Sequence, residues 1–436
     1  MKTTNNETTA IDSGSVSLQT TEAKSGFYES LFRKAMGNAK EGQMSVLVPG
    51  GRSFTLGEAK PGKQNAVLEV KDVHFFQHAV LYGEIGFGET YMEGMIDSPD
   101  MLKVLRWFVD NAVATPGFAA AGKKLFVNIL GIANKIRHTL RPNTVKIARK
   151  NIAEHYDLSN EMYEYMLGSS MAYSSGLFLT GKEDLKTAQE NKFESLCQKL
   201  QLKPGLHMLE IGSGWAGFAI YAAKKYGVKI TTITISEKQF DYCKKRIEEE
   251  NLQSLIELKL IDYRHIDGQY DRIVSIEMVE ALGFRYFDTY FGKMASLLKK
   301  DGLMAIQAIT MPDTRFSNYI KGESDFIQKH IFPGSCLLSQ NEITRSLLRT
   351  SDLNIYHSES MAMSYTRTLA EWRKNFNENI EEIRKMGFSE RFIRKWNYYL
   401  LYCEAGFGSR YINVIQLLFS RPQNTQLQDF HGLKNQ

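Results

Sequence analysis

A short apolar segment that ends at an acid and continues into a glycine-rich turn constrains the fold of this chain most strongly. The segment is HMLEI at residues 207–211, and the turn GSGWAG at 212–217 leads into an apolar stretch typical of a helix start. A strand, a glycine turn and a helix in this order form the nucleotide-binding unit of a parallel α/β sheet. Gly212 and Gly214 let the backbone approach a ligand closely, which a Cβ atom would obstruct. The segment therefore predicts a nucleoside site.

Two ligands and one purely structural interpretation compete for this turn. Gly212, Gly214 and Gly217 also fit the dinucleotide pattern G-x-G-x-x-G, a weak signal by itself. Glu210 precedes the first glycine, where it would attract the ammonium group of a methionine-type ligand and repel a pyrophosphate. The next predicted strand, residues 228–235, lacks the terminal acid that would bind a ribose 2′-hydroxyl. These residues favour S-adenosylmethionine (SAM) over NAD, with a turn that serves packing alone as the third interpretation.

The length and composition indicate a globular protein of two or three domains. The chain has 436 residues, of which 43% are hydrophobic, and its four cysteines are scattered. No cysteine, histidine or carboxylate spacing suggests a metal site, so we expect no metal and a reduced, cytoplasmic setting. Neither a signal-peptide pattern nor a run of about 18 apolar residues occurs, so we expect neither secretion nor a membrane span.

The chain before the glycine turn begins with two parts of different composition. Residues 1–24 are polar and poor in apolar side chains, which predicts a disordered tail. Residues 25–122 are expected to form a small α/β module. Its predicted elements are a helix at 27–36, strands at 45–48, 53–56, 66–70 and 74–80, a hairpin turn at Gly50 and Gly51, and a tight packed turn at 83–94.

A basic segment, residues 123–151, follows this module. Eight Lys or Arg and no Asp or Glu lie between residues 123 and 150, whereas the whole chain has a net charge of +5. Apolar side chains alternate with the basic ones, which predicts a linker helix that contacts anionic lipid. A domain-linking helix with a solvated basic face is an equally weighted alternative. No nucleic-acid partner is expected, because the interleaved apolar residues suit an interfacial helix better than a nucleic-acid stripe, which would need exposed stacking aromatic residues.

Residues 152–436 are expected to form one catalytic domain. Strands and helices alternate here at the spacing of a parallel, doubly wound sheet, which binds its ligand at the carboxyl ends of the strands. The predicted strands are 208–211, 229–235, 256–261, 272–276 and 303–309, and the predicted helices are 218–226, 237–250 and 286–298.

Several blocks of this domain resemble the cyclopropane fatty acid synthase family, whose members alkylate double bonds of phospholipid acyl chains with SAM. The resemblance implies a Rossmann-like class I SAM-dependent methyltransferase sheet with a helical lid, preceded by a small α/β lipid-associating domain. The blocks, in the order of the family, are HYDLSN at 155–160, MAYSS at 171–175, LEIGSGWAG at 209–217, TISEKQ at 234–239, EMVEALG at 277–283, IFPG at 331–334 and YCEAGF at 402–407.

The same resemblance assigns residues to the binding of SAM. The resemblance implies that Tyr173 and Ser174 close over SAM, that Glu210, Gly212 and Gly214 hold its methionine end, that Thr234 and Gln239 reach the ribose, and that Asp262, Tyr263 and Arg264 flank the adenine. For Thr234 and Gln239 the alternative to a ribose contact is a purely structural role, as a helix N-cap and as a polar residue in the first turn of a helix.

The resemblance also implies how the reaction is completed. Methyl transfer to an alkene leaves a carbocation that must lose a proton to close the ring, which requires a dry site and a base. In this family the base is a bicarbonate ion, and Glu280, the amide of Ile309 and Tyr365 match groups that hold it. Ser175 stands at the position of a cysteine and Gln307 at that of a common histidine, and both can still donate hydrogen bonds to the anion. If these replacements weaken the base, the cation is quenched in another way, so a methyl- or methylene-branched product is the alternative to a cyclopropane.

Cys403 matches a C-terminal cysteine that has been proposed as catalytic in the family. We favour the interpretation of a half-buried, small apolar residue on a helix, because methyl transfer to an alkene needs no thiolate. Cys403 remains a further candidate.

Two other classes of function stay open. One is a small-molecule N-methyltransferase, against which Ala281 counts because that branch has a histidine there. The other is a lipid-binding or SAM-sensing protein without catalysis. The main prediction is an enzyme that acts on phospholipid acyl chains at a membrane surface, peripherally associated with the inner face of the membrane. Whether it forms a homodimer is left open.

Overall fold

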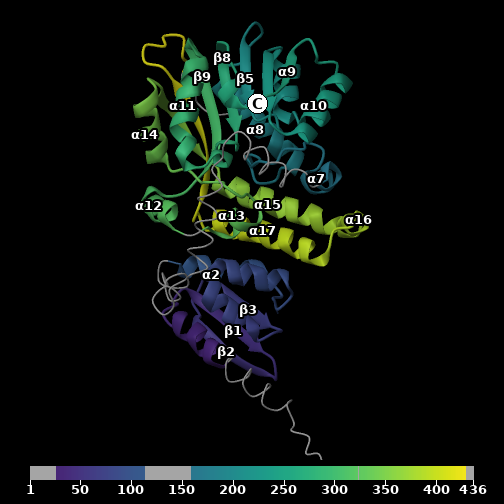
Figure 1. Ribbon diagram of the computed structural model, residues 1–436, viewed down its shortest axis with the longest axis vertical. Helices are drawn as coiled ribbons and strands as arrows, with labels where there is room; N and C mark the ends of the chain where they lie inside the picture. Colours follow the sequence, from purple (N-terminus) through teal and green to yellow (C-terminus); the bar gives the residue numbers. More distant parts are fainter. Residues whose placement is uncertain (1–25, 113–158, 323, 429–436) are drawn as a thin grey trace, which may run out of the picture. The chain divides into compact units, whose positions relative to one another are not determined.

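The computed structural model describes residues 26–112, 159–322 and 324–428 (Figure 1). Contacts divide the chain into two compact units, Met1–Asn128 and Ile129–Gln436. The predicted tail (1–24) and the predicted basic helix (123–151) lie outside the described residues. The predicted domain boundaries at 122, 151 and 152 fall in the same undescribed part and stay predictions.

The N-terminal unit contains a four-stranded sheet with the strand order β2-β1-β3-β4. β1 pairs with β2 antiparallel and with β3 parallel, and Gly50 and Gly51 form the turn between β1 and β2 with positive φ angles. The predicted strands 45–48, 53–56 and 66–70 are therefore confirmed. The elements are β1 (Gly42–Val48), β2 (Arg52–Glu58), β3 (Asn65–Val70), α2 (His74–Met92), β4 (Ile96–Asp97) and α3 (Met101–Asn111).

The strand predicted at 74–80 is wrong, because this segment begins helix α2. Phe75, Phe76 and Ala79 are buried on one side, which is the spacing of a helix and not the alternation of a strand. Most of the packed turn predicted at 83–94 also lies within α2, which ends at Met92, and Gly83 interrupts the helix with a φ of 57°. A Cβ atom at Gly86 would lie 2.2 Å from the carbonyl oxygen of His78, so this glycine permits a close approach within the unit.

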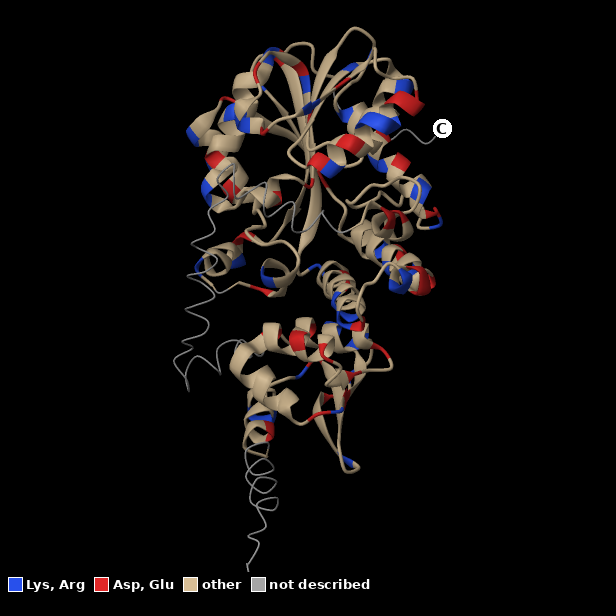
Figure 2. Cartoon of the chain, turned by 45° about the vertical axis from the view of Figure 1, so that its right-hand side comes forward, with Lys and Arg blue, Asp and Glu red and all other residues tan. Residues whose placement is uncertain are grey.

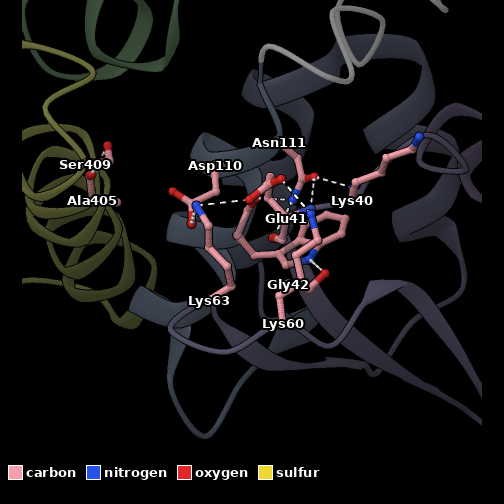
Figure 3. A network of polar contacts seen from close by, with 10 residues as sticks. Lys40, Glu41, Gly42, Lys60, Lys63, Asp110, Asn111, Ala405 and Ser409 are labelled. Atoms are coloured by element: carbon pink, nitrogen blue, oxygen red, sulfur yellow. Dashed lines mark hydrogen bonds and ion pairs between the residues drawn. The ribbon is translucent and has the colours of Figure 1, made fainter.

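Polar contacts join α3 to the start of β1 (Figure 3). The side-chain oxygen of Asn111 accepts hydrogen bonds from the amides of Lys40 and Glu41, at 2.9 and 3.0 Å, and its nitrogen donates to the carbonyl of Glu41. Trp107 donates from its indole nitrogen to the carbonyl of Gly42 at 2.9 Å. Asn111 and Trp107 are both buried, so these bonds satisfy backbone groups that water does not reach.

The second unit contains a seven-stranded sheet with the strand order β10-β11-β9-β8-β5-β6-β7. β7, β6, β5, β8 and β9 are parallel to one another, whereas β11 pairs antiparallel with β9 and β10 with β11. The five predicted strands of this domain are confirmed, and β10 and β11 were not predicted. The bounds are β5 (His207–Ile211), β6 (Lys229–Thr234), β7 (Ile256–Leu260), β8 (Tyr270–Ile276), β9 (Leu298–Thr310), β10 (Asn354–Ser360) and β11 (Asn413–Ser420).

Helices cover both faces of this sheet and enclose an apolar core on each face. Met208 lies in the core with α8, α9 and α10, whereas Leu209 lies in the core with α11 and α14. A parallel strand buried on both faces in this way is typical of doubly wound folds. Charged residues of both signs are interspersed along the surrounding helices (Figure 2). The helices are α8 (Leu185–Lys199), α9 (Gly217–Tyr226), α10 (Glu237–Glu249), α11 (Phe287–Leu297) and α14 (Gln340–Thr350).

A further group of helices lies across one end of the sheet (Figure 1). Tyr365 of α15 bonds to Glu277, which directly follows β8, so the group covers the carboxyl ends of the parallel strands. None of the helices within the described residues is long and apolar enough to cross a membrane. The other helices of this unit are α7 (Asn160–Leu167), α12 (Asp313–Lys321), α13 (Phe326–His330), α15 (Ala362–Glu378), α16 (Ile380–Lys385) and α17 (Glu390–Gly408).

Candidate active site

The glycine turn that follows β5 has the conformation and the space that a bound nucleoside requires. Gly212 and Gly214 have φ angles of 94° and 51°, and residues other than glycine adopt such positive φ angles only at a cost in energy. A Cβ atom at Gly214 would meet nothing within 4 Å, so the space beside this residue is open. A Cβ atom at Gly212 would lie 3.1 Å from the side chain of Met278. The turn and the loop after β8 therefore approach each other closely.

Glu210 lies at the carboxyl end of β5 with its carboxyl group buried. The hydroxyl of Thr232 lies 2.5 Å from its Oε2 atom and 2.8 Å from the hydroxyl of Ser213. Burial raises the pKa of Glu210 to about 8, although the Thr232 bond and the charge of Lys192 act in the opposite direction. A cation bound beside this carboxyl would favour its charged form. The site therefore fits the ammonium group of a methionine-type ligand.

The residues predicted to reach the ribose and the adenine lie after β6 and β7. Thr234 donates to the side-chain oxygen of Gln239 at 2.9 Å and accepts the amide of Ser236 at 3.1 Å. Ser236, not Thr234, is the N-cap of α10. Asp262 accepts two bonds from the guanidinium of Arg264, at 2.8 and 2.7 Å. The hydroxyl of Tyr263 is buried and has no hydrogen-bond partner among the described residues, which leaves it available to a ligand.

The segment Tyr173 to Gly176 is held by one face of α8 and by α15. Lys192 donates to the hydroxyl of Ser174 at 2.7 Å, and Gln189 donates to the Ser174 carbonyl at 2.9 Å. The amide of Gly176 donates to Thr368 of α15 at 3.0 Å. Burial lowers the pKa of Lys192 to about 7, against the opposing charges of Glu277 and Glu210. The ring of Tyr173 lies 5.3 Å from that of Trp372, within a larger aromatic cluster.

Three of the predicted catalytic residues meet at a side chain that the sequence interpretation did not single out, Glu277. Its Oε1 atom accepts the amide of Ser175 at 2.9 Å and the side-chain nitrogen of Gln307 at 2.7 Å. Its Oε2 atom accepts the hydroxyl of Tyr365 at 2.9 Å. The hydroxyl of Ser175 donates instead to the carbonyl of Gly176, so its backbone and not its side chain binds this carboxylate. Glu277 directly follows β8, and Glu210 is the last residue but one of β5. An acid near the carboxyl end of a strand is the signal that could have identified Glu277.

A chain of polar side chains fixes which way the amide of Gln307 points. Lys199 can only donate, and it donates to the side-chain oxygen of Gln416 at 2.6 Å. The nitrogen of Gln416 then donates to the oxygen of Gln307 at 2.9 Å. The nitrogen of Gln307 must therefore face Glu277. This buried chain presents a hydrogen-bond donor at the site, which a carboxylate satisfies.

Glu280 lies beside this cluster in the short helix Val279–Leu282. Its Oε1 atom accepts the amide of Ile309, so two groups that were predicted to hold bicarbonate bond to each other. Its Oε2 atom is buried and has no hydrogen-bond partner among the described residues. Burial, and next the charge of Glu277, raise the pKa of Glu280 to about 8. Two acidic side chains thus lie close together at the carboxyl ends of β8 and β9.

The groups predicted to hold bicarbonate do not form a vacant anion site in this structure. The Gln307 side chain and the Tyr365 hydroxyl are bonded to Glu277, the Ser175 hydroxyl donates to the carbonyl of Gly176, and the Ile309 amide donates to Glu280. A free anion would have to compete with a carboxylate that belongs to the chain and carries the same charge. The donor set therefore does not fit bicarbonate, and no step of the reaction is derived through it.

Comparison with known proteins identifies the family. The family description "Mycolic acid cyclopropane synthetase" matches residues 143–417, which is more than half of the chain. The chain belongs to this family. It is 36% identical to tuberculostearic acid methyltransferase UfaA1 of Mycobacterium tuberculosis over 77% of this chain and 78% of that protein. It is 34% identical to cyclopropane-fatty-acyl-phospholipid synthase of Escherichia coli K12 over 84% of this chain and 90% of that one.

A solved structure supports the same assignment. The mycolic acid cyclopropane synthase CmaA1, in complex with SAH and CTAB, matches with a TM-score of 0.58 and 26% identity, over 63% of this chain and 98% of that chain. The fold is therefore that of a class I SAM-dependent methyltransferase, and the protein is a SAM-dependent methyltransferase of a lipid-modifying family. Membership of the mycolic acid cyclopropane synthetase family favours SAM over NAD at the glycine turn.

Proposed function

We propose that the protein transfers the methyl group of SAM to a double bond in an unsaturated phospholipid acyl chain and closes a cyclopropane ring. The observation that carries this proposal is the pair of acids, Glu277 and Glu280, at the carboxyl ends of β8 and β9, next to the glycine turn. An alkene gives up no proton until after it is methylated, so the site needs a base that is close to the reacting carbon. The two named relatives that modify fatty acyl chains support a lipid substrate.

The reaction balances without a redox partner. The π electrons of the alkene attack the methyl carbon of SAM, the bond from sulfur to that carbon breaks, and S-adenosylhomocysteine leaves. The neighbouring alkene carbon becomes a carbocation. Loss of one proton from the transferred methyl group closes the ring, and the net change in the acyl chain is one added CH₂ group. The protein must hold SAM, exclude water and accept this proton.

The aromatic cluster beside Glu277 suits both an apolar chain and a transient cation. The ring of Tyr365 lies 4.3 Å from that of Phe407 and 6.0 Å from that of Trp372, and the ring of Tyr173 lies 6.1 Å from that of Phe332. The negative faces of aromatic rings attract a cation and give it no nucleophile with which to react. In this proposal Tyr173, Ser174, Glu210, Gly212, Gly214, Thr234, Gln239, Asp262, Tyr263 and Arg264 hold SAM.

A methyl- or methylene-branched product is the second candidate. A methyl-branched alkene follows if the proton is lost from the chain carbon beside the cation instead of the new methyl group. A methylene branch follows if a hydride shift first moves the cation to the carbon that bears the new methyl group, and that group then loses the proton. Both products are isomers of the cyclopropane. Glu277 accepts hydrogen bonds from Ser175, Gln307 and Tyr365, residues that were predicted to hold bicarbonate. This contact favours the branched product, because the base is then a side chain of the protein and does not bind as a separate ion. The relative UfaA1, named as a tuberculostearic acid methyltransferase, also favours it.

Mass spectrometry of phospholipids from cells that express the protein tests the proposal. Monounsaturated acyl chains should gain about 14 Da in the presence of SAM, the mass of one CH₂ group. Catalytic hydrogenation then separates the two candidates, because a cyclopropane resists mild reduction whereas a branched alkene takes up two hydrogen atoms. If acyl chains stay unchanged while a small amine gains a methyl group, the protein is an N-methyltransferase and the proposal is wrong.

Substitution of Cys403 by Ser is expected to leave turnover within about threefold of the wild-type value. Burial, and next the charge of Asp325, raise the pKa of the Cys403 thiol, so the thiolate that a nucleophile requires does not form at neutral pH. Turnover on unsaturated phospholipid vesicles measures the effect. A loss of a hundredfold in a folded variant that still binds SAM would assign a catalytic role to this thiol.

The site of action is part of the same proposal. Unsaturated phospholipid chains are found in membranes, so the enzyme is proposed to work in the cytoplasm, at the inner face of the membrane. The basic segment of residues 123–151 is proposed to contact anionic headgroups there. Vesicle co-sedimentation that depends on anionic lipid and falls with salt would support this docking.

A further inference from the structure

The side chain of Glu277 is a half-buried acid of the site to which the expected mechanism gives no role. It is a charged group held by three donors from three separate parts of the chain: the amide of Ser175, the side chain of Gln307 on β9, and Tyr365 on α15. A buried or half-buried carboxylate with this many partners is not an incidental surface charge.

The backbone of Glu277 is in a conformation that favours glycine. Its φ angle is 49°, and its amide is fixed by a bond to the carbonyl of Gln307 at 2.7 Å. A residue with a β-carbon adopts this left-handed conformation only when the surrounding structure holds it there, and such residues concentrate at functional sites. A glycine would fold more easily at this position. The glutamate is therefore present for its carboxylate and not for the backbone.

From these contacts we infer that the carboxylate of Glu277 is the base that removes the proton after methyl transfer, in the place where a free bicarbonate was expected. This inference rests on the proposed function. The loop that carries Glu277 touches the glycine turn, because Met278 lies 3.1 Å from where a Cβ atom of Gly212 would be. Lys192 interacts with the charges of both Glu277 and Glu210, so the carboxylate lies in the same region as the acid proposed to bind the methionine end of SAM, from which the methyl group departs.

The chemistry of Glu277 suits this role. Within the described residues its Oε2 atom accepts one hydrogen bond, from Tyr365, and so retains a lone pair that can take a proton. Glu277 is half-buried, so its donors do not enclose it completely. Burial raises its pKa above the ordinary value, which makes the carboxylate a stronger base than an exposed glutamate.

The electron and proton balance is complete with the groups on the chain. A C–H bond of the transferred methyl group breaks and its electron pair forms the ring bond, or a C–H bond of the chain carbon beside the cation breaks and its pair forms a double bond. In either case the proton binds to Oε2 of Glu277. Lys192, whose charge interacts with both Glu277 and Glu210, stabilises the carboxylate before this step. Release of the proton to solvent restores the carboxylate, so neither bicarbonate nor another co-reactant is consumed.

Two substitutions of Glu277 that differ in the space they leave provide the test. Glu277→Gln keeps the shape and fills the site but removes the base, whereas Glu277→Gly opens the site and suits the positive φ angle. The assay uses the full-length protein with SAM and unsaturated phospholipid vesicles, in CO₂-free buffer and in buffer with added bicarbonate. Calorimetric titration with SAM reports whether each variant is folded.

Wild-type turnover should be the same with and without bicarbonate. Glu277→Gln should lose activity by a factor on the order of 10² in both buffers, the usual scale for a general base. Glu277→Gly should be equally slow without bicarbonate and should recover at least tenfold when bicarbonate is added, because the free anion can then occupy the three donors.

The outcomes separate this inference from the proposed function. No product from the wild-type protein under any condition would overturn both. Wild-type product that disappears when bicarbonate is removed, or a folded Glu277→Gln variant with wild-type turnover, would overturn the inference alone. If bicarbonate does not accelerate a folded Glu277→Gly variant, the carboxylate of Glu277 does not occupy the place where a free bicarbonate would bind, and the inference is wrong.

Discussion

Substitution of Glu280 by Gln is expected to lower turnover on unsaturated phospholipid by a factor on the order of 10² or more. The carboxyl of Glu280 has a pKa of about 8 in the ligand-free protein, because it is buried and lies near Glu277. SAM and the carbocation that forms after methyl transfer are both cations, and both favour the charged form of this carboxyl. A glutamine cannot become charged, so it cannot stabilise the cation. Its amide nitrogen would also replace Oε2, a buried atom without a partner among the described residues, which costs about 1–3 kcal/mol.

The pH dependence of kcat/KM gives this prediction a second readout. The pKa of Glu280 is raised from 4.5 to about 8, so the group is protonated in the free enzyme at lower pH and charged at higher pH. The wild-type kcat/KM should therefore rise as the pH increases toward about 8, and the rise should be shallower in Glu280→Gln. Glu378→Gln is the matched control, because it removes the same charge from an exposed site on α15. A Glu280→Gln variant that is as active as this control would show that Glu280 plays no part in the reaction.

The nucleoside turn and the parallel strands were predictable because their signals are local. Residues 207–217 contain the strand, the acid and the glycines in one continuous stretch, and the structure has β5, the turn and α9 at that place. The parallel strands β6, β7, β8 and β9 follow the same repeating pattern of strand and helix. Each of these elements depends mainly on its own sequence.

The order of the last strands was not predictable in the same way. β11 lies between β9 and β10 in the sheet, although α15, α16 and α17 separate it from β10 along the chain. Its sequence NVIQLLFS is a short apolar run that fits a buried strand or part of a buried helix. Its antiparallel pairing with β9 depends on tertiary packing, which no local pattern reports. Gln416 on this strand is nevertheless essential to the orientation of Gln307.

The polar support of the site was missed for a related reason. Gln189, Lys192, Ser195 and Lys199 recur along one side of α8, and a polar helix face usually indicates a surface exposed to water. In the structure these four side chains are buried and hold Ser174 and Gln416. Their partners lie far away in the sequence, so spacing alone could not reveal the contacts. Glu277 was visible in the sequence as an acid directly after a predicted strand, but its three donors were not.

Substitution of Gly212 by Val is expected to abolish measurable SAM binding. The φ angle of Gly212 is 94°, and a valine there would be strained by about 1–3 kcal/mol. Its Cβ atom would also press against the side chain of Met278, at 3.1 Å, and its two methyl groups would need further space beside the turn. Either the turn moves away from Met278 or the valine occupies space proposed for the methionine end of SAM. Both changes displace Glu210 from the ammonium group it is proposed to bind, and calorimetric titration with SAM measures the result.

Gly205→Val separates backbone strain from the loss of the ligand site. Gly205 has a φ angle of 87°, close to that of Gly212, but a Cβ atom there would meet nothing within 4 Å. It lies in the turn before β5, whereas Gly212 lies after that strand. Gly205→Val should therefore lower the melting temperature through strain and keep its affinity for SAM, because the carboxyl end of β5 is unchanged. If Gly212→Val unfolds no more readily than Gly205→Val and binds SAM as tightly, the methionine end of SAM does not contact this turn.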